Sequence, residues 1–187
     1  MKTIYIILLT TWFCITTVTI HGQSPIQKKY ENETYSIYGW TDSLKIETGK
    51  WICIVNSKNK LDSEKLKDKC NCNVPNMDGL SIIKKVMKSV FSVEKQKALA
   101  AATNRKAIRY ALYYNAETGQ ILYIEFQLYG MQLSEKEESD TAVTLKEIYQ
   151  LETQLKTQRL KVDCDCTHTQ SKYSCDFYSM SLNNINK

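Results

Sequence analysis

The chain has 187 residues, of which 43% are hydrophobic and 24% are charged, and this balance excludes a disordered or collagen-like protein. The formal net charge of +5, from 25 basic and 20 acidic residues, is too modest and too mixed in sign to indicate nucleic-acid binding. We expect one domain, or one domain with an appendage, because domains cluster at about 100–150 residues.

Residues 1–22 are expected to form a signal peptide. Lys2 is a short basic region, an uncharged stretch runs from Thr3 to Ile20, and the small residue Gly22 precedes the cleavage point. The alternative is an uncleaved membrane anchor, because an uncharged run of this length could just span a bilayer. Cleavage leaves 165 residues with a net charge of +4 and no membrane anchor. The expected location is therefore outside the cytoplasm, as a periplasmic or secreted protein.

The next part of the chain, residues 23–34, is polar and is expected to be a flexible leader. It ends at Asn32-Glu33-Thr34, which fits an N-glycosylation acceptor and has meaning only in a eukaryotic secretory route. Residues 35–187 are expected to form a single α+β domain.

Its first predicted elements are a hairpin and two helices. Apolar residues alternate on both sides of residues 47–50, which predicts two strands joined by a short turn. Apolar residues then recur at steps of three and four from Leu80 to Phe91, with lysines on the opposite side, which predicts an amphipathic helix. An alanine-rich helix is expected from residue 94 to 102.

A second hairpin is the clearest pattern in the chain. Its strands are predicted at residues 108–114 and 122–128, around a turn that ends at Gly119. Thr144 and Glu147 then have the spacing of a capping box, which begins another helix. Two segments with strand character follow, at residues 159–166 and 173–182. The predicted class is α+β, with an antiparallel sheet, two main helices packed on one face, and disulfide staples.

Six cysteines remain after the expected cleavage, and export makes disulfides the first interpretation of an even set. They are Cys53, Cys70, Cys72, Cys164, Cys166 and Cys175. Six cysteines allow 15 pairings. In an extended Cys-x-Cys both side chains point to the same face and reach a neighbouring segment more easily than each other. We therefore expect one local bridge in each half, from Cys53 and from Cys175 to the nearby pair, and a third bridge between the halves.

A metal site is the alternative interpretation of the same cysteines. Cys164 and Cys166, with His168 two residues on, could bind zinc or copper(I) through thiolates. However, structural zinc sites usually space their cysteines by two to four residues, and oxidation outside the cytoplasm competes with metal binding. We therefore expect disulfides and no cofactor.

Residues 80–166 resemble, in topology, the C-terminal domain of TonB-type periplasmic proteins. The resemblance depends on the segment Tyr110-Ala111-Leu112-Tyr113-Tyr114-Asn115-Ala116-Glu117-Thr118-Gly119-Gln120-Ile121-Leu122 and the helix after it. It implies a hairpin with a polar turn, two helices on one sheet face, and a domain that works by protein contact. The whole chain is also similar in style to small exported Bacteroidetes proteins of unknown function.

Catalytic motifs are absent from the sequence. After cleavage His168 is the one remaining histidine, and no Gly-x-Ser-x-Gly, His-Glu-x-x-His or phosphate-binding glycine loop occurs. Acidic pairs such as Asp163 with Asp165 are interpreted as solvated charges. We expect no enzyme.

The tyrosines of the second hairpin indicate a binding surface instead. Tyr113, Tyr123 and Tyr129 are expected on the less apolar face together with Ile121, and helices on the other face would leave these rings partly exposed. The alternative is that another part of the chain covers them. The predicted function is a non-catalytic binding or assembly module that contacts a protein, a second copy or a glycan. A secreted inhibitor or host-directed factor is the second hypothesis, and a thiolate metal protein is the third.

Overall fold

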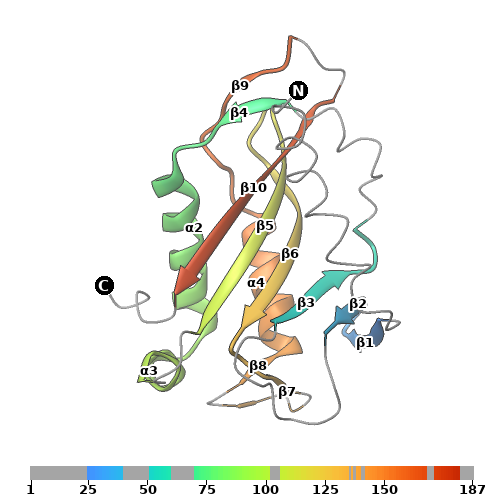
Figure 1. The fold of residues 1–187 in the computed structure, drawn as a ribbon, viewed down its shortest axis with the longest axis vertical. Helices are drawn as coiled ribbons and strands as arrows, with labels where there is room; N and C mark the ends of the chain where they lie inside the picture. The colour runs from blue at the N-terminus through green and yellow to red at the C-terminus, as the bar shows by residue number, and fades with distance from the viewer. Residues whose placement is uncertain are drawn as a thin grey trace, which may run out of the picture.

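A six-stranded antiparallel sheet forms the centre of the molecule (Figure 1). The computed structural model describes residues 25–39, 51–59, 70–101, 106–134, 136, 138–139, 142–167 and 171–181. The strand order is β1–β2–β3–β6–β5–β10. These strands are β1 (Ile26–Tyr30), β2 (Glu33–Tyr38), β3 (Trp51–Asn56), β5 (Ala107–Asn115), β6 (Ile121–Tyr129) and β10 (Tyr173–Ser181). Strands from the middle of the chain therefore occupy the middle of the sheet.

In the described part of the chain, two short strand pairs lie outside the main sheet. β4 (Asn71–Asn73) pairs antiparallel with β9 (Asp163–Asp165), and β7 (Leu133–Ser134) pairs parallel with β8 (Val143–Thr144). The first pair is the place where the two disulfides form.

The β5–β6 hairpin confirms the clearest prediction from the sequence. Its turn is stabilised by the Asn115 side chain, whose Oδ1 accepts hydrogen bonds from the backbone N–H groups of Glu117 and Thr118 at 2.9 Å each. Gly119 has a φ of 68°, and a Cβ there would clash with the carbonyl oxygen of Leu160. The turn therefore requires glycine for both its conformation and its space.

The described residues also form three helices: α2 (Asn76–Val90), α3 (Val93–Ala101) and α4 (Leu145–Lys156). Helices α2 and α4 contact each other and pack on the same face of the sheet, as predicted. Helix α4 begins with the expected capping box, in which the Thr144 hydroxyl accepts from Glu147 N–H at 3.2 Å. The Glu147 carboxylate accepts from Thr144 N–H at 2.9 Å.

The main core lies between the two helices and the sheet. The strands contribute alternate side chains that face the helices, and α2 and α4 contribute one apolar side each. Fully buried members are Tyr35, Ile37, Ile52, Ile54, Ile108, Tyr110, Leu112, Tyr114, Ile124, Phe126, Leu128, Ile83, Met87, Ile148, Leu151 and Leu155. Helix α2 approaches β10 closely at Gly79, where a Cβ would collide with the ring of Tyr178.

The expectation of a flexible leader over residues 23–34 is wrong from Ile26 onward. Residues Ile26–Tyr30 form β1 and pair with β2 along the whole strand. Alternate side chains of this edge strand are half-buried, and the ring of Tyr30 lies 5.5 Å from that of Tyr149 on α4. The sequence of this segment is polar because its other side chains face water, as is usual for an edge strand.

One further expectation about strands lies outside the described residues, and another differs from the structure. The predicted turn at residues 47–50 lies outside the described residues, and β3 after it pairs with β2 and β6. The predicted strand at residues 159–166 is reduced to β9, which pairs with β4 and not with the main sheet. The strand that pairs with β5 on the side away from β6 is β10.

Candidate functional site

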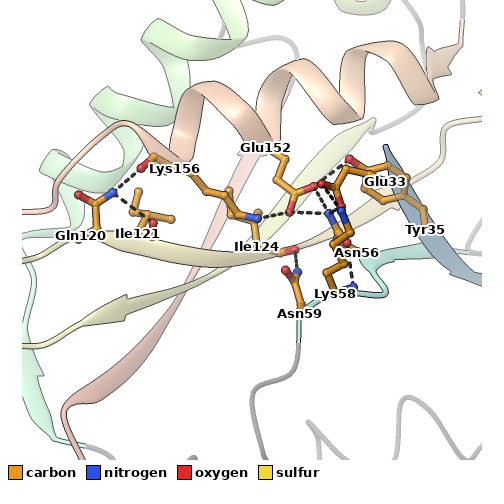
Figure 2. Close-up of polar contacts among 10 residues, drawn as sticks. All are labelled: Glu33, Tyr35, Asn56, Lys58, Asn59, Gln120, Ile121, Ile124, Glu152 and Lys156. Atoms are coloured by element: carbon orange, nitrogen blue, oxygen red, sulfur yellow. Dashed lines mark hydrogen bonds and ion pairs between the residues drawn. The ribbon is translucent and has the colours of Figure 1, made fainter. Parts of the chain in front are cut away.

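The buried carboxylate of Glu152 is the centre of a polar cluster between α4 and the sheet (Figure 2). Glu152 is 3% exposed. Its oxygens accept hydrogen bonds from Tyr35 Oη at 2.8 Å and from Asn56 Nδ2 at 3.1 Å. The ammonium of Lys156, one helical turn later, forms an ion pair with it at 2.6 Å. The donors to the two carboxylate oxygens therefore come from β2, β3 and α4.

A second carboxylate, Glu33, extends this cluster toward the surface. It accepts from Asn56 Nδ2 and from Lys58 Nζ, each at 3.0 Å. Burial by itself would raise the pKa of Glu33, but the hydrogen bonds from Asn56 and Lys58 and the positive charge of Lys58 outweigh it and hold the pKa below its usual value. Figure 2 also shows hydrogen bonds to backbone carbonyls, from Asn59 to Ile124 and from Gln120 to Ile121 and to Lys156.

The chemistry of this cluster is that of a structural tie. Burial and the nearby negative charge of Glu152 raise the pKa of Tyr35 far above its usual value, so the hydroxyl stays protonated and acts as a donor. Each oxygen of Glu152 already accepts two hydrogen bonds from side chains of the protein. The cluster joins α4 to β2 and β3 and was not predicted from the sequence.

Lys95 forms a second buried ion pair, between α3 and the start of α4. Its Nζ lies 2.6 Å from Glu147 Oε2 and 2.6 Å from the carbonyl oxygen of Ala142, and it stands over the ring of Phe91. Glu147 thus serves both the capping box and this lysine. Here too the charged group has its partners, which favours a structural role.

The sheet face opposite α2 and α4 is the other candidate site, and we call it the far face. Directly opposed residues of neighbouring strands share a face, so the pairing assigns its members. They are Ser36 and Tyr38 on β2, Trp51, Cys53 and Val55 on β3, Tyr123, Glu125, Gln127 and Tyr129 on β6, Arg109, Ala111 and Tyr113 on β5, and Cys175, Phe177 and Ser179 on β10. The far face therefore combines aromatic, amide and charged side chains.

Three of the four residues predicted for a binding face lie on the far face, and one does not. Tyr113, Tyr123 and Tyr129 are there, whereas Ile121 is opposite Tyr114 and is buried in the core under the helices. The register shifts between Tyr113 and Tyr114, and this irregularity moves Ile121 to the other side. The prediction for Ile121 is therefore wrong.

Exposure separates the three tyrosines. Tyr113 is only 7% exposed, Tyr123 is half-buried, and Tyr129 is 42% exposed. The Tyr113 hydroxyl donates to Glu125 Oε1 at 3.1 Å. The expectation of a partly exposed ring is thus wrong for Tyr113, which leaves Tyr129 as the tyrosine with most surface to offer.

Burial raises the pKa of two ionisable groups of the far face. Burial raises the pKa of Glu125 above its usual value, although the hydrogen bond from Tyr113 opposes this. Burial and the negative charge of Glu125 raise the pKa of the Cys53 thiol to about 12. A thiol with such a pKa is protonated at neutral pH and is a poor nucleophile.

Phe177 is the binding-face candidate that the sequence reasoning missed. It is 57% exposed, while Tyr178 and Met180 beside it are buried under the helices. The signal in the sequence was the period of two in β10. Phe177 is an odd number of positions from Tyr178 and Met180, so its side chain faces the opposite side of the sheet. Of the described residues, only Val93, Tyr129 and Phe177 are large, apolar and exposed, and the last two share the far face.

The cysteine pairing differs from the expectation. The two bridges are Cys70–Cys166 and Cys72–Cys164, so both join one Cys-x-Cys segment to the other. The antiparallel ladder of β4 and β9 sets Cys72 directly opposite Cys164, which explains the choice. The predicted local bridges of Cys53 and Cys175 are wrong, because these residues lie in β3 and β10 and take part in neither bridge.

The metal interpretation loses its ligands for the same reason. Cys164 and Cys166 are both oxidised in bridges and have no thiolate to offer. His168 lies outside the described residues. Within the described part of the chain, no group of three or more His, Cys, Asp or Glu residues is arranged to hold a metal ion.

The fold has a counterpart among solved structures. No protein-family model matches the sequence, and a search of curated proteins gives no match. The crystal structure of a DUF5043 family protein from Bacteroides uniformis matches with a TM-score of 0.57 and 12% identity, over 84% of this chain and 85% of that chain. At this identity the likeness shows the fold alone. It is consistent with the expected resemblance to Bacteroidetes proteins, while the TonB likeness is unconfirmed.

The disulfides bear on the location of the protein. The two disulfides fit an oxidising compartment outside the cytoplasm. None of the described helices is long and apolar enough to cross a membrane.

Proposed function

We propose that the protein is a non-catalytic binding module that contacts another protein through its far face. The observation that carries the proposal is the position of Tyr129 and Phe177. Two of the three large apolar side chains exposed among the described residues lie on the one sheet face opposite α2 and α4. Exposed aromatic side chains are enriched at protein interfaces, where tyrosine offers a large contact area with a polar tip.

The surroundings of Tyr129 support a protein partner. Tyr129 is directly opposite Ala107 on one side and Trp51 on the other, so its ring stands beside a small and a large apolar residue. Gln127 and Arg109, one pleat further along, are opposite each other and add hydrogen-bond donors. An apolar centre with a polar surround is the usual arrangement of a protein interface.

The clusters of buried charge argue against catalysis as the alternative. Glu152 and Lys95 have hydrogen-bond and ion-pair partners, and Glu125 is the far-face carboxylate whose pKa is raised. Glu125 accepts a hydrogen bond from Tyr113, and its charge raises the pKa of the protonated Cys53 thiol. A general acid or base needs a partner that accepts or supplies its proton at the substrate, and no such pair stands out among the described residues.

The test is site-specific photo-cross-linking in the native host. Tyr129 is replaced by p-benzoylphenylalanine, with the same replacement at Val93 as control, since Val93 is 57% exposed on α3. The proposal expects one protein to be cross-linked from position 129 and not from position 93. The purified partner should then bind Tyr129→Ser about tenfold more weakly than the parent and Val93→Ser equally well.

Two results would contradict the proposal. Equal cross-linking from both positions would mean that position 129 has no special contact. The second result is that the protein retains a glycan ligand while Tyr129→Ser binds the protein partner as tightly as the parent does. It would mean that the far face contacts a sugar and not a protein.

A further inference from the structure

Arg109 is an exposed cation on the far face. It lies on β5, with Gln127 of β6 directly opposite on one side and Ser179 of β10 directly opposite on the other. Within the described part of the chain, its side chain takes part in no hydrogen bond or ion pair. The N–H donors of its guanidinium therefore remain available to a partner.

The strand register places the two exposed aromatic rings on either side of Arg109. Tyr129 is opposite Ala107, two residues before Arg109 on β5, and Phe177 is opposite Ala111, two residues after it. Such diagonal neighbours lie about 7–8 Å apart, within reach of aromatic and long side chains. Tyr129, Arg109 and Phe177 thus form a line across β6, β5 and β10, with the cation in the middle.

The accessible charge on this side of the sheet is positive. Glu125 is also a diagonal neighbour of Arg109, but it is half-buried and accepts the hydrogen bond from Tyr113. Among the described strand residues of this side, the exposed charges are Arg109 and Lys29 of β1, which is opposite Thr34. A protein surface that complements this face in charge is therefore acidic.

A carboxylate fits the group at the centre of this line. The planar guanidinium of an arginine binds a carboxylate through two parallel N–H···O bonds. In open water such a pair contributes little, because both charges are hydrated and salt screens them. Apolar rings on both sides exclude water once a partner covers them, and the attraction between the charges then becomes stronger.

We propose that Arg109 binds the side-chain carboxylate of an aspartate or glutamate that the protein partner inserts between Tyr129 and Phe177. This inference rests on the far-face contact proposed above and adds the chemistry of the partner. The partner presents an acidic residue with apolar residues on either side, which cover the two rings. Gln127 and Ser179, directly opposite Arg109, offer uncharged polar groups to the surrounding backbone of the partner.

Selection from a phage library of random peptides tests this chemistry with a probe of known sequence. The library is panned on the immobilised full protein with its disulfides intact, and in parallel on Arg109→Gln, Tyr129→Ser and Arg159→Gln. Arg159 is the matched control, because it is an exposed arginine that follows α4 and is not part of the far face. The parent and Arg159→Gln should select peptides with Asp or Glu between apolar residues. Arg109→Gln should select apolar peptides without this acid, and Tyr129→Ser should select neither kind.

A double-mutant cycle with one selected peptide then measures the pair. Replacing the acid of the synthetic peptide by its amide should weaken binding to the parent by at least about tenfold, as measured by fluorescence anisotropy. The same replacement should change binding to Arg109→Gln by less than about twofold, because the partner of the acid is already absent. Arg109→Lys keeps the charge but loses the paired bonds, so its affinity should lie between those of the parent and Arg109→Gln.

The outcomes separate this inference from the far-face contact itself. Selected peptides that need Tyr129 but show no preference for an acid would overturn the carboxylate and leave the protein contact standing. An equal loss for the amide peptide on the parent and on Arg109→Gln would do the same. If the parent selects no peptide, or if Tyr129→Ser selects the same peptides as the parent, the far-face contact is contradicted and this inference falls with it.

Discussion

The hydroxyl of Tyr35 donates a 2.8 Å hydrogen bond to Glu152, which lies 117 residues further along the chain. This bond joins β2, near one edge of the sheet, to the helix that covers its centre. Glu152 is buried and charged, and it depends on its donors to offset the cost of its desolvation.

Tyr35→Phe should therefore destabilise the fold. The ring keeps its packing, but the buried carboxylate loses one donor, which costs about 1.5 to 3 kcal/mol in the free energy of unfolding. Urea denaturation monitored by circular dichroism measures the effect. Tyr38→Phe is the matched control, because Tyr38 lies on the same strand and on the far face, and it should change stability by less than about 0.5 kcal/mol. Equal effects of the two variants would show that Glu152 does not need this donor.

Glu125 gives a prediction for pH dependence. Burial raises its pKa in the folded state, so folding favours the protonated carboxyl. The stability that this group contributes is complete below its unfolded pKa and is lost as the pH rises through the higher folded pKa. Glu125→Gln should therefore stabilise the protein at pH 7 and flatten the fall in stability between acid and neutral pH. The same profile measured for the exposed Glu138→Gln should match the parent, and an identical profile for Glu125→Gln would contradict the prediction.

The close contact of Gly79 and Tyr178 predicts a coupled pair of substitutions. Gly79→Ala adds a Cβ in the space of the Tyr178 ring and should destabilise by about 1 to 3 kcal/mol. In a Tyr178→Leu background the same change should cost less or stabilise by up to about 1 kcal/mol, because alanine is the better helix former. A double-mutant cycle by chemical denaturation gives the coupling energy. Ser81→Ala, on the exposed side of α2, controls for helix propensity, and additive effects in the cycle would refute the contact.

The two disulfides should be strongly non-additive. They close loops with sequence separations of 96 and 92 residues, and one loop lies inside the other. Removing Cys72–Cys164 by a double serine substitution leaves nearly the same loop closed and should cost about 2 kcal/mol. Removing both bridges opens the long loop and should cost about 4 to 5 kcal/mol more in the chain-entropy model. Denaturation of the two variants beside the parent measures this, and a second bridge that costs no more to remove than the first would contradict the prediction.

Local patterns in the sequence predicted the local parts of the fold. The alternation around Gly119 predicted the β5–β6 hairpin, and the spacing of Thr144 and Glu147 predicted the start of α4. These signals depend on residues within a few positions of each other, where the periods of strands and helices act directly.

Features made by distant parts of the chain had no such signal. The alignment of Cys72 with Cys164 depends on the β4–β9 ladder, and the partners of Glu152 come from strands about 100 residues away. Ile121 was misplaced because one extra residue in a strand reverses the side on which its neighbours lie. The far face was predicted from its tyrosines, but Phe177 belongs to a strand whose position beside β5 follows only from the tertiary structure.

The strand order also determines when the sheet can be completed during synthesis. β5 and β6 can pair as soon as both have left the ribosome or the translocation channel, yet β3 must wait for β6 and β5 must wait for β10. The hydrogen-bonding groups along β5 thus stay without their second strand until β10 emerges. A chain that stops before β10 would present β5 as an open edge, so truncation at its carboxyl end should promote aggregation more than loss of β1 does.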